Sequence, residues 1–430
     1  MVMELNRLSA VDAVRMLQRR ELTAVQLMRA CFARIEQRED AVHAWAALDK
    51  DAALAHAQEL DEGPIAGPLH GLPFGVKDLF DTRDFPTTYG SPIYQDHRPQ
   101  TDATAVARCR AAGALVAGKT VTTEFATFKA PLTRNPHNPA YTPGGSSSGS
   151  AAAVADNMVP FALGTQTAAS VIRPAAYCGV VGFKPTFGAI PRDGIKALAP
   201  SLDTVGCFTR TVEDAALVAS VLMDKPELRR LDYDGPPRVG IYRTHQWRHT
   251  LPETRDAVTQ AAETLARSRA VVQEVDLPPE CCSLVQLQSD IMAFETSRSL
   301  AVERDQYASR LSPDLLALLE GGDRIAPDRH QANLRRAADM YARVANWFER
   351  FDVLLTPSAA GEAPFADLGT GDPLFGRVWT MFGLPCIHLP FATGPHGLPV
   401  GVQIVARKGE DHRLLCIAKW MHARLRPSPQ

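Results

Sequence analysis

Short apolar segments alternate with helical ones between residues 100 and 225. Residues 103–112 have a helical pattern and are followed by an apolar strand at 114–117. A second helix begins at 150–155, and another apolar strand follows at 159–163. Strands that alternate with helices in this way are typical of an α/β protein whose sheet is largely covered. The sequence therefore predicts an α/β core.

The rest of the chain divides by pattern and contains no convincing linker. Residues 1–65 are helical and rich in alanine, whereas residues 280–350 form a longer and more charged helical stretch. We expect this second stretch to form a lid or a side wall. The Pro- and Gly-rich residues 357–376 are interpreted as a loop. We therefore predict one domain over residues 1–430, with its core at 66–225.

Charge and apolar patterning exclude several classes of protein. Lys and Arg number 46 and Asp and Glu number 48, so the chain lacks the basic excess that nucleic-acid binding needs. No apolar run approaches the roughly 18 residues of a membrane span, and the first eight residues lack the apolar core of a signal peptide. The eight cysteines form no CxxC pair, which argues against a metal site. Free thiols favour a reducing, cytoplasmic setting.

Two familiar motifs occur in unsuitable surroundings. Residues 113–120 match GxxxxGK[ST], a phosphate-binding loop, but their apolar middle is better explained as a strand that ends at a surface lysine. A nucleotide-binding protein that uses this loop stays as an alternative. Residues 145–149 contain GxSxG, which would make Ser147 a nucleophile. Residues 138–144 before it cannot form the strand that such a turn requires.

Lys77 follows directly on a short apolar strand at 73–76. Burial disfavours the charged form of a lysine and can lower its pKa from about 10.4 by several units, which makes it a base near neutral pH. A lysine at a strand end can instead extend its ammonium group to water. The position of Lys77 leaves both interpretations open.

Two runs of small residues, 142–150 and 164–170, each lead into a helical stretch. Such turns present hydroxyls and free backbone N–H groups. Together with Lys77 they supply the parts of a hydrolase without histidine, in which Ser170 is the nucleophile and a second hydroxyl carries its proton to the lysine. Backbone N–H groups beside Ser170 would form the oxyanion hole. The alternative for Ser170 is a helix N-cap.

These segments resemble the amidase signature family of serine hydrolases. The likeness runs from about residue 71 to 215 and includes GLPFGVKD at 71–78, TPGGSSSGSAAAV at 142–154 and GTQTAASVIRPA at 164–175. It resumes near the C-terminus in FDVLLTP, GLP and GLPVGVQI, at 351–357, 383–385 and 397–404. The resemblance implies a twisted mixed sheet flanked by helices. It also implies hydrolysis of a C–N bond through an acyl-enzyme, without a metal or organic cofactor.

The resemblance assigns a role to each site residue. Lys77 matches the catalytic lysine, Ser170 matches the nucleophile, and Ser146 matches the serine of a cis peptide that bridges them. The backbone stretch that forms the oxyanion hole is matched by Thr167, Ala168, Ala169 and Ser170.

Three features depart from the usual family pattern. Ala168 and Ala169 stand where the family usually has two glycines, and their methyl groups would crowd the oxyanion hole if positive φ were required. Gln166 stands where many members have aspartate. Arg173 lies three residues after the nucleophile, as in the malonamidase-like branch, where an arginine holds a substrate carboxylate. A structural ion pair at a helix start is the alternative for Arg173.

The resemblance leaves the substrate open. The pocket is expected to include Arg173 and Gln166 together with Tyr89, Met292, Trp379 and Phe382, although the last four could equally belong to the core. Small amides are the expected substrates, with aryl amides, esters, ureas and carbamates (urethanes) as further candidates. The A subunit of a glutamine-dependent tRNA amidotransferase is the alternative within the family, and it needs partner subunits and an ammonia channel. For a stand-alone hydrolase, the malonamidase-like branch suggests a homodimer.

Overall fold

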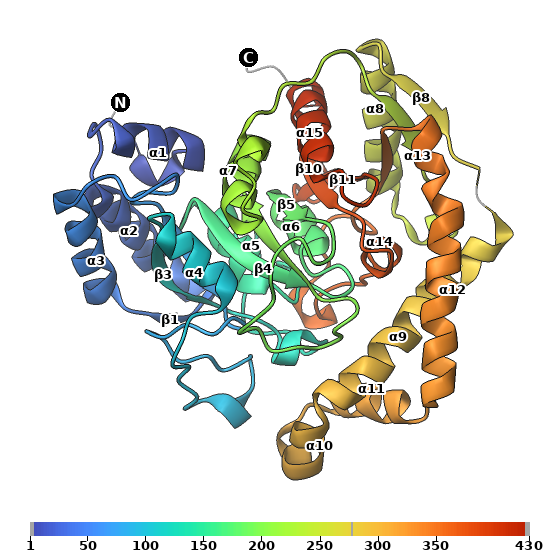
Figure 1. Ribbon diagram of the computed structural model, residues 1–430, viewed down its shortest axis with the longest axis horizontal. Coiled ribbons are helices and arrows are strands. Elements are labelled where there is room, and N and C mark those ends of the chain that lie inside the picture. Colours follow the sequence, from blue (N-terminus) through green and yellow to red (C-terminus); the bar gives the residue numbers. More distant parts are fainter. Residues whose placement is uncertain (1–3, 277, 426–430) are drawn as a thin grey trace.

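The computed structural model describes residues 4–276 and 278–425, so the first three residues of the N-terminal segment considered above lie outside the described residues (Figure 1). The described strands form one mixed sheet of 11 strands in the order β1-β3-β2-β4-β6-β5-β10-β11-β9-β7-β8. Their bounds are β1 Trp45–Leu48, β2 Pro73–Lys77, β3 Leu115–Thr120, β4 Phe161–Gln166, β5 Val181–Lys184, β6 Thr204–Thr209, β7 Arg238–Ile241, β8 Val271–Glu274, β9 Val353–Pro357, β10 Cys386–Thr393 and β11 Pro399–Val405. Strand β2 runs parallel to β3 and β4, and β7 runs parallel to β8 and β9, whereas the other pairs are antiparallel.

Helices flank this sheet along its whole length, as Figure 1 shows. The α-helices are α1 Ala10–Gln18, α2 Ala24–Val42, α3 Lys50–Glu62, α4 Thr104–Ala111, α5 Ser148–Ala155, α6 Ile172–Cys178, α7 Val212–Leu222, α8 Pro252–Arg267, α9 Leu284–Ser299, α10 Ala301–Tyr307, α11 Pro313–Asp323, α12 Pro327–Ala345, α13 Trp347–Arg350, α14 Arg377–Met381 and α15 Asp411–Leu425. Helices α5 and α6 contact each other and the central strands, as do α7 and α15. The α/β fold with a mixed sheet between helices is therefore confirmed.

The N-terminal helices begin where local sequence signals place them. The Ser9 hydroxyl accepts a hydrogen bond from the backbone N–H of Asp12 and so caps α1. Thr23 and Gln26 form a reciprocal capping box at the start of α2. Helices α1 to α3 lie at one end of the view in Figure 1, and the yellow and orange helices α9 to α12 form an arm at the other end.

Several sequence expectations differ from the structure in detail. The strand expected at 114–117 continues to Thr120, because β1 and β2 pair with β3 on both sides. Lys119 is therefore fully buried, and the expected surface lysine is wrong. The helical region 1–65 also contains strand β1. This strand has only four residues, which are too few to show a periodic pattern in the sequence.

The described residues place most thiols in the core. Seven of the eight cysteines are buried free thiols, and Cys282 is exposed. Among the helices of residues 4–276 and 278–425, none is long and apolar enough to cross a bilayer. All described strands share one sheet, which suits the single domain that we predict.

Candidate active site

Lys77 lies at the end of β2 with no solvent exposure. Its Nζ donates hydrogen bonds to the hydroxyls of Ser146 and Thr165, both at 2.8 Å. Burial lowers the pKa of Lys77 to about 7, and the charge of Asp203 opposes part of that shift. A lysine in this setting is available as a neutral base near pH 7, and its ammonium group does not reach water.

Ser146 belongs to the turn that precedes α5. The peptide bond between Gly145 and Ser146 is cis, as the resemblance implies. The neighbouring hydroxyls form hydrogen bonds with the backbone. Ser148 Oγ donates to the carbonyl of Gly144 at 2.7 Å, and Ser147 Oγ donates to the carbonyl of Thr165 at 3.3 Å. Ser147, the centre of the GxSxG motif, is therefore a fully buried connection between this turn and β4.

Ser170 lies in the second small-residue turn, between β4 and α6, and is 8 % exposed. Gln166 shapes this turn, because its side-chain oxygen accepts from the backbone N–H groups of Val171 at 2.9 Å and Ile172 at 3.0 Å. Its amide nitrogen donates to the Thr380 hydroxyl at 2.9 Å. Gln166 thus holds the start of α6 and ties it to α14.

The backbone N–H groups of Thr167, Ala168, Ala169 and Ser170 have no acceptor within the described part of the chain. Neither alanine has a positive φ, so the strain considered above does not arise. A Cβ atom at Gly376 would lie 2.6 Å from the Cβ of Ala169. The absence of a side chain at Gly376 therefore makes room for the methyl group that replaces the usual hydrogen.

A cleft of about 390 Å³, including its open mouth, contains Ser170. The residues that line it are Ala126, Thr127, Phe128, Thr167, Ala168, Ser170, Arg173, Leu198, Met292, Leu318, Pro373 and Arg377. Met292 comes from α9 and Leu318 from α11, so the helical arm supplies one wall of the cleft. Met292 and Arg173 were expected at the pocket from the sequence. Arg377 was not, because no recognisable motif surrounds it.

Four other residues expected at the pocket lie elsewhere, and the fully buried Gln166 described above is one of them. The Tyr89 hydroxyl donates to Asp81 at 2.9 Å, and its ring packs on Tyr94. Trp379 and Phe382 are buried in a hydrophobic cluster that also contains Met292. None of these four residues lines the cleft that contains Ser170.

Arg173 is 5 % exposed and is held by backbone groups. Its two terminal nitrogens donate to the carbonyls of Gly371 and Gly145, the second at 2.6 Å. Burial lowers the pKa of Arg173 to about 10. Arg173 therefore connects residues 370–371 to the cis peptide beside Ser146, and the ion pair that was considered for it is not present among the described residues.

Lys119 occupies the neighbouring strand and has a different environment. Its Nζ lies 3.1 Å from Asp78 Oδ1 and donates to the carbonyl of Phe80 at 2.7 Å and to the hydroxyl of Thr87 at 2.6 Å. Burial lowers the pKa of Lys119, and the carboxylate of Asp78 opposes that shift. A lysine with all its donors engaged inside a strand pair is not placed to bind a phosphate, so the phosphate-loop interpretation of 113–120 is wrong.

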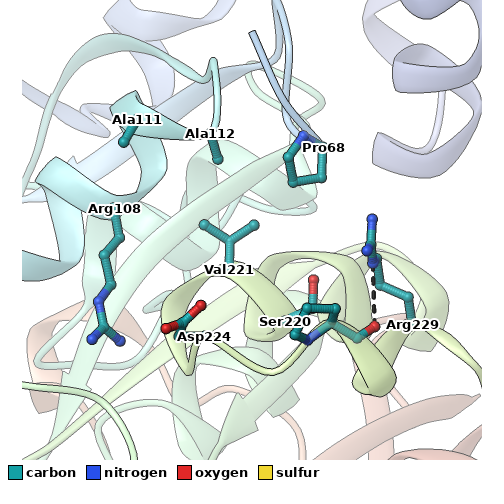
Figure 2. A pocket seen from close by; sticks show the side chains of 9 residues that line it. Pro68, Arg108, Ala111, Ala112, Ser220, Val221, Asp224 and Arg229 are labelled. Carbon is teal, nitrogen blue, oxygen red and sulfur yellow. Dashed lines mark hydrogen bonds between the residues drawn. The ribbon is translucent and has the colours of Figure 1, made fainter.

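A second hollow lies on the surface between α4 and α7 (Figure 2). Arg108 and Arg229 line it, and they donate to the backbone carbonyls of Leu222 at 2.6 Å and Pro226 at 3.3 Å. None of Lys77, Ser146 and Ser170 lines this hollow. Residues 4–276 and 278–425 also contain no group of three or more His, Cys, Asp or Glu side chains arranged to hold a metal ion.

The comparisons with known proteins agree with this fold. The family model described as Amidase matches residues 26–415. The A subunit of the glutamyl-tRNA(Gln) amidotransferase of Lachnospira eligens is 33% identical over 95% of this chain and 96% of its own length. A solved structure described as an amidase has a TM-score of 0.90 and 31% identity, covering 97% of this chain and all of that one. The peptide amidase from Stenotrophomonas maltophilia has a TM-score of 0.85 and 28% identity, covering 97% of both chains.

The fold and these likenesses define an α/β enzyme that acts on C–N bonds. More particularly, the chain belongs to the amidase family, the amidase signature enzymes.

Proposed function

We propose that this protein hydrolyses the C–N bond of a small amide through an acyl-enzyme on Ser170. The observation that carries the proposal is the contact of 2.8 Å between Lys77 and Ser146, because it joins a buried lysine whose pKa is lowered to about 7 to a serine hydroxyl. Ser170 stands beside backbone N–H groups that have no acceptor in the described part of the chain, and it lines the cleft.

The proton path follows from the lysine's neutral form. The lone pair of neutral Lys77 takes the proton of the Ser146 hydroxyl, and Ser146 takes the proton of Ser170 as Ser170 Oγ bonds to the amide carbon. The hydroxyl of Thr165 accepts a hydrogen bond from Nζ of Lys77. This contact keeps the lone pair of the lysine nitrogen directed to Ser146. The negative charge that develops on the carbonyl oxygen is stabilised by the N–H groups of residues 167–170.

Collapse of this intermediate breaks the C–N bond. The proton that was held by the relay returns through Ser146 to the nitrogen, which leaves as an amine or ammonia. A water molecule then attacks the acyl carbon and gives its proton to Ser146, which passes its own proton to Lys77. The proton returns through Ser146 to Ser170 Oγ as the bond between Oγ and the acyl carbon breaks, and a carboxylic acid is released. This route uses no metal or organic cofactor. Esters, aryl amides, ureas and carbamates contain the same polarised carbonyl and are further candidate substrates.

The amidotransferase relatives support a second candidate, the A subunit of a glutamine-dependent amidotransferase. Glutamine carries an α-ammonium group, and recognition of that group calls for a carboxylate. None of the described residues lining the cleft is acidic. We therefore favour a stand-alone amidase over a protein that depends on partner subunits. The free thiols favour a cytoplasmic setting for it, and the malonamidase-like resemblance suggests a homodimer.

A single substitution tests the proposal. Ser170→Ala should reduce turnover of small amides by at least about 10³-fold while leaving the thermal unfolding midpoint unchanged, because only one hydroxyl oxygen at the cleft is removed. Mass spectrometry of wild-type protein quenched during turnover of an aryl ester should show the acyl group on Ser170. Amide hydrolysis that persists in Ser170→Ala would overturn the proposal. The control Ser147→Ala removes a hydroxyl that bonds to backbone, and it should retain most activity.

A further inference from the structure

Two guanidinium groups face the cleft that contains Ser170. Arg173 and Arg377 both line it, and no acidic side chain is among its described lining residues. Neither arginine has a carboxylate oxygen within 4 Å among residues 4–276 and 278–425. The negative charge of Asp372 acts on both only from a greater distance. Two cations without a close counter-ion in a buried cleft attract an anionic group of a ligand.

The two arginines differ in how many donors they have left. The terminal nitrogens of Arg173 donate to the backbone carbonyls of Gly371 and Gly145, and one also approaches the Thr370 hydroxyl at 3.4 Å. Its Nε is buried without a partner. Arg173 is thus committed to holding the loop at 370–371, and it has no free pair of parallel N–H groups for a bidentate contact.

Arg377 has one occupied donor and a neutral partner. Its Nη1 donates to the side-chain oxygen of Gln288 at 2.5 Å. The amide nitrogen of Gln288 donates in turn to the carbonyl of Thr167 at 3.0 Å. The guanidinium is therefore fixed relative to the turn that carries Ser170, and its charge is not neutralised by its partner.

We propose that Arg377 is the specificity-determining residue of the cleft and binds the carboxylate of a substrate that is both an amide and an acid. This inference rests on the proposed function, since it names the substrate class of the same site. Binding of the carboxylate places the reactive amide beside Ser170 and supplies the missing counter-charge to the two buried arginines. A neutral amide of the same length lacks this contact and reacts more slowly.

A matched pair of four-carbon amides tests the inference. Wild-type protein should hydrolyse succinamate with a higher kcat/KM than butyramide. Arg377→Gln should lower kcat/KM for succinamate by about 100-fold, chiefly through KM, and that for butyramide by less than about 5-fold. Arg377→Lys keeps the charge without the planar fork and should recover part of the loss. The control Arg229→Gln removes a guanidinium from the hollow of Figure 2 and should change neither substrate.

A binding measurement separates this inference from the proposed function. Titration of succinate into Ser170→Ala by calorimetry should show binding that weakens at least about 10-fold when Arg377→Gln is added, whether or not amides are hydrolysed. Equal losses on succinamate and butyramide in Arg377→Gln, or selectivity that is lost only in Arg173→Gln, would overturn the inference. Amide turnover that survives Ser170→Ala overturns the proposed function instead.

Discussion

The ends of strands β2 and β3 hold two buried lysines with contrasting surroundings. The strands are parallel neighbours, and Val76 pairs with Lys119 while Lys77 pairs with Thr120. Both lysines have no solvent exposure. Lys119 has the carboxylate of Asp78 at 3.1 Å, whereas Lys77 has two hydroxyls and no carboxylate within 4 Å among the described residues.

This contrast shows that burial alone does not make a lysine into a base. Desolvation lowers the pKa of both side chains. The carboxylate of Asp78 in contact with Lys119 favours the charged lysine and opposes the effect of burial, so the pair holds two strand ends together. Lys77 is buried among neutral hydroxyls, and it is the lysine that can lose its proton near neutral pH.

The largest expected effect comes from Lys77→Met, which removes the base but keeps the volume. Amide turnover should fall by at least about 10³-fold, because nothing else in the relay can take the proton of Ser146. The free energy of unfolding should stay within about 1.5 kcal/mol of the wild type, since a buried amine without a counter-ion is replaced by an apolar chain. Steady-state kinetics and urea unfolding measure the two quantities. A large loss of stability with activity retained would reverse the roles assigned to the two lysines.

Lys119→Met should have the opposite profile. It leaves Asp78 buried without its cation and should destabilise the fold by about 3–5 kcal/mol, while the folded protein keeps activity within about ten-fold. Adding Asp78→Asn removes the unpaired charge and should regain part of that stability. Urea unfolding of the single and double variants checks this. An additive second loss in the double variant would show that the pair is not coupled.

The smallest effects concern the hydroxyls that contact each amine. Wild-type kcat/KM should rise with pH around a midpoint near 7, because protonated Lys77 cannot accept a proton from Ser146. Thr165→Val removes an acceptor that favours the charged lysine, so the midpoint should move to lower pH, with about a ten-fold loss at the plateau. Thr87→Val, the matched change beside Lys119, should cost about 1 kcal/mol of stability and leave the midpoint in place. A midpoint that moves equally in both variants would contradict the assignment of Lys77 as the base.

Local pattern made much of the fold predictable. The helices expected at 103–112 and 150–155, the strand before Lys77 and the small-residue turns are all short-range signals, and the structure has elements at each of them. Strand β1 and the continuation of β3 through Lys119 escaped prediction, because pairing partners distant in sequence define them. The sequence also did not decide whether Trp379 and Phe382 belong to the pocket or to the core, because aromatic residues near a loop occur in both. The structure places them in the core.

The sequence by itself was enough to predict which residues carry the chemistry. A lysine after an apolar strand and serines in two turns of small residues can be recognised from neighbours a few residues away. Which buried lysine loses its charge depends on Asp78, Ser146 and Thr165, which the fold brings together from separate segments. The same holds for the arginines, because Gly371 and Gly145 occupy Arg173 while Gln288 leaves Arg377 with free donors. Desolvation and counter-charge act through space over a few ångströms, and distance along the chain does not reveal that spacing.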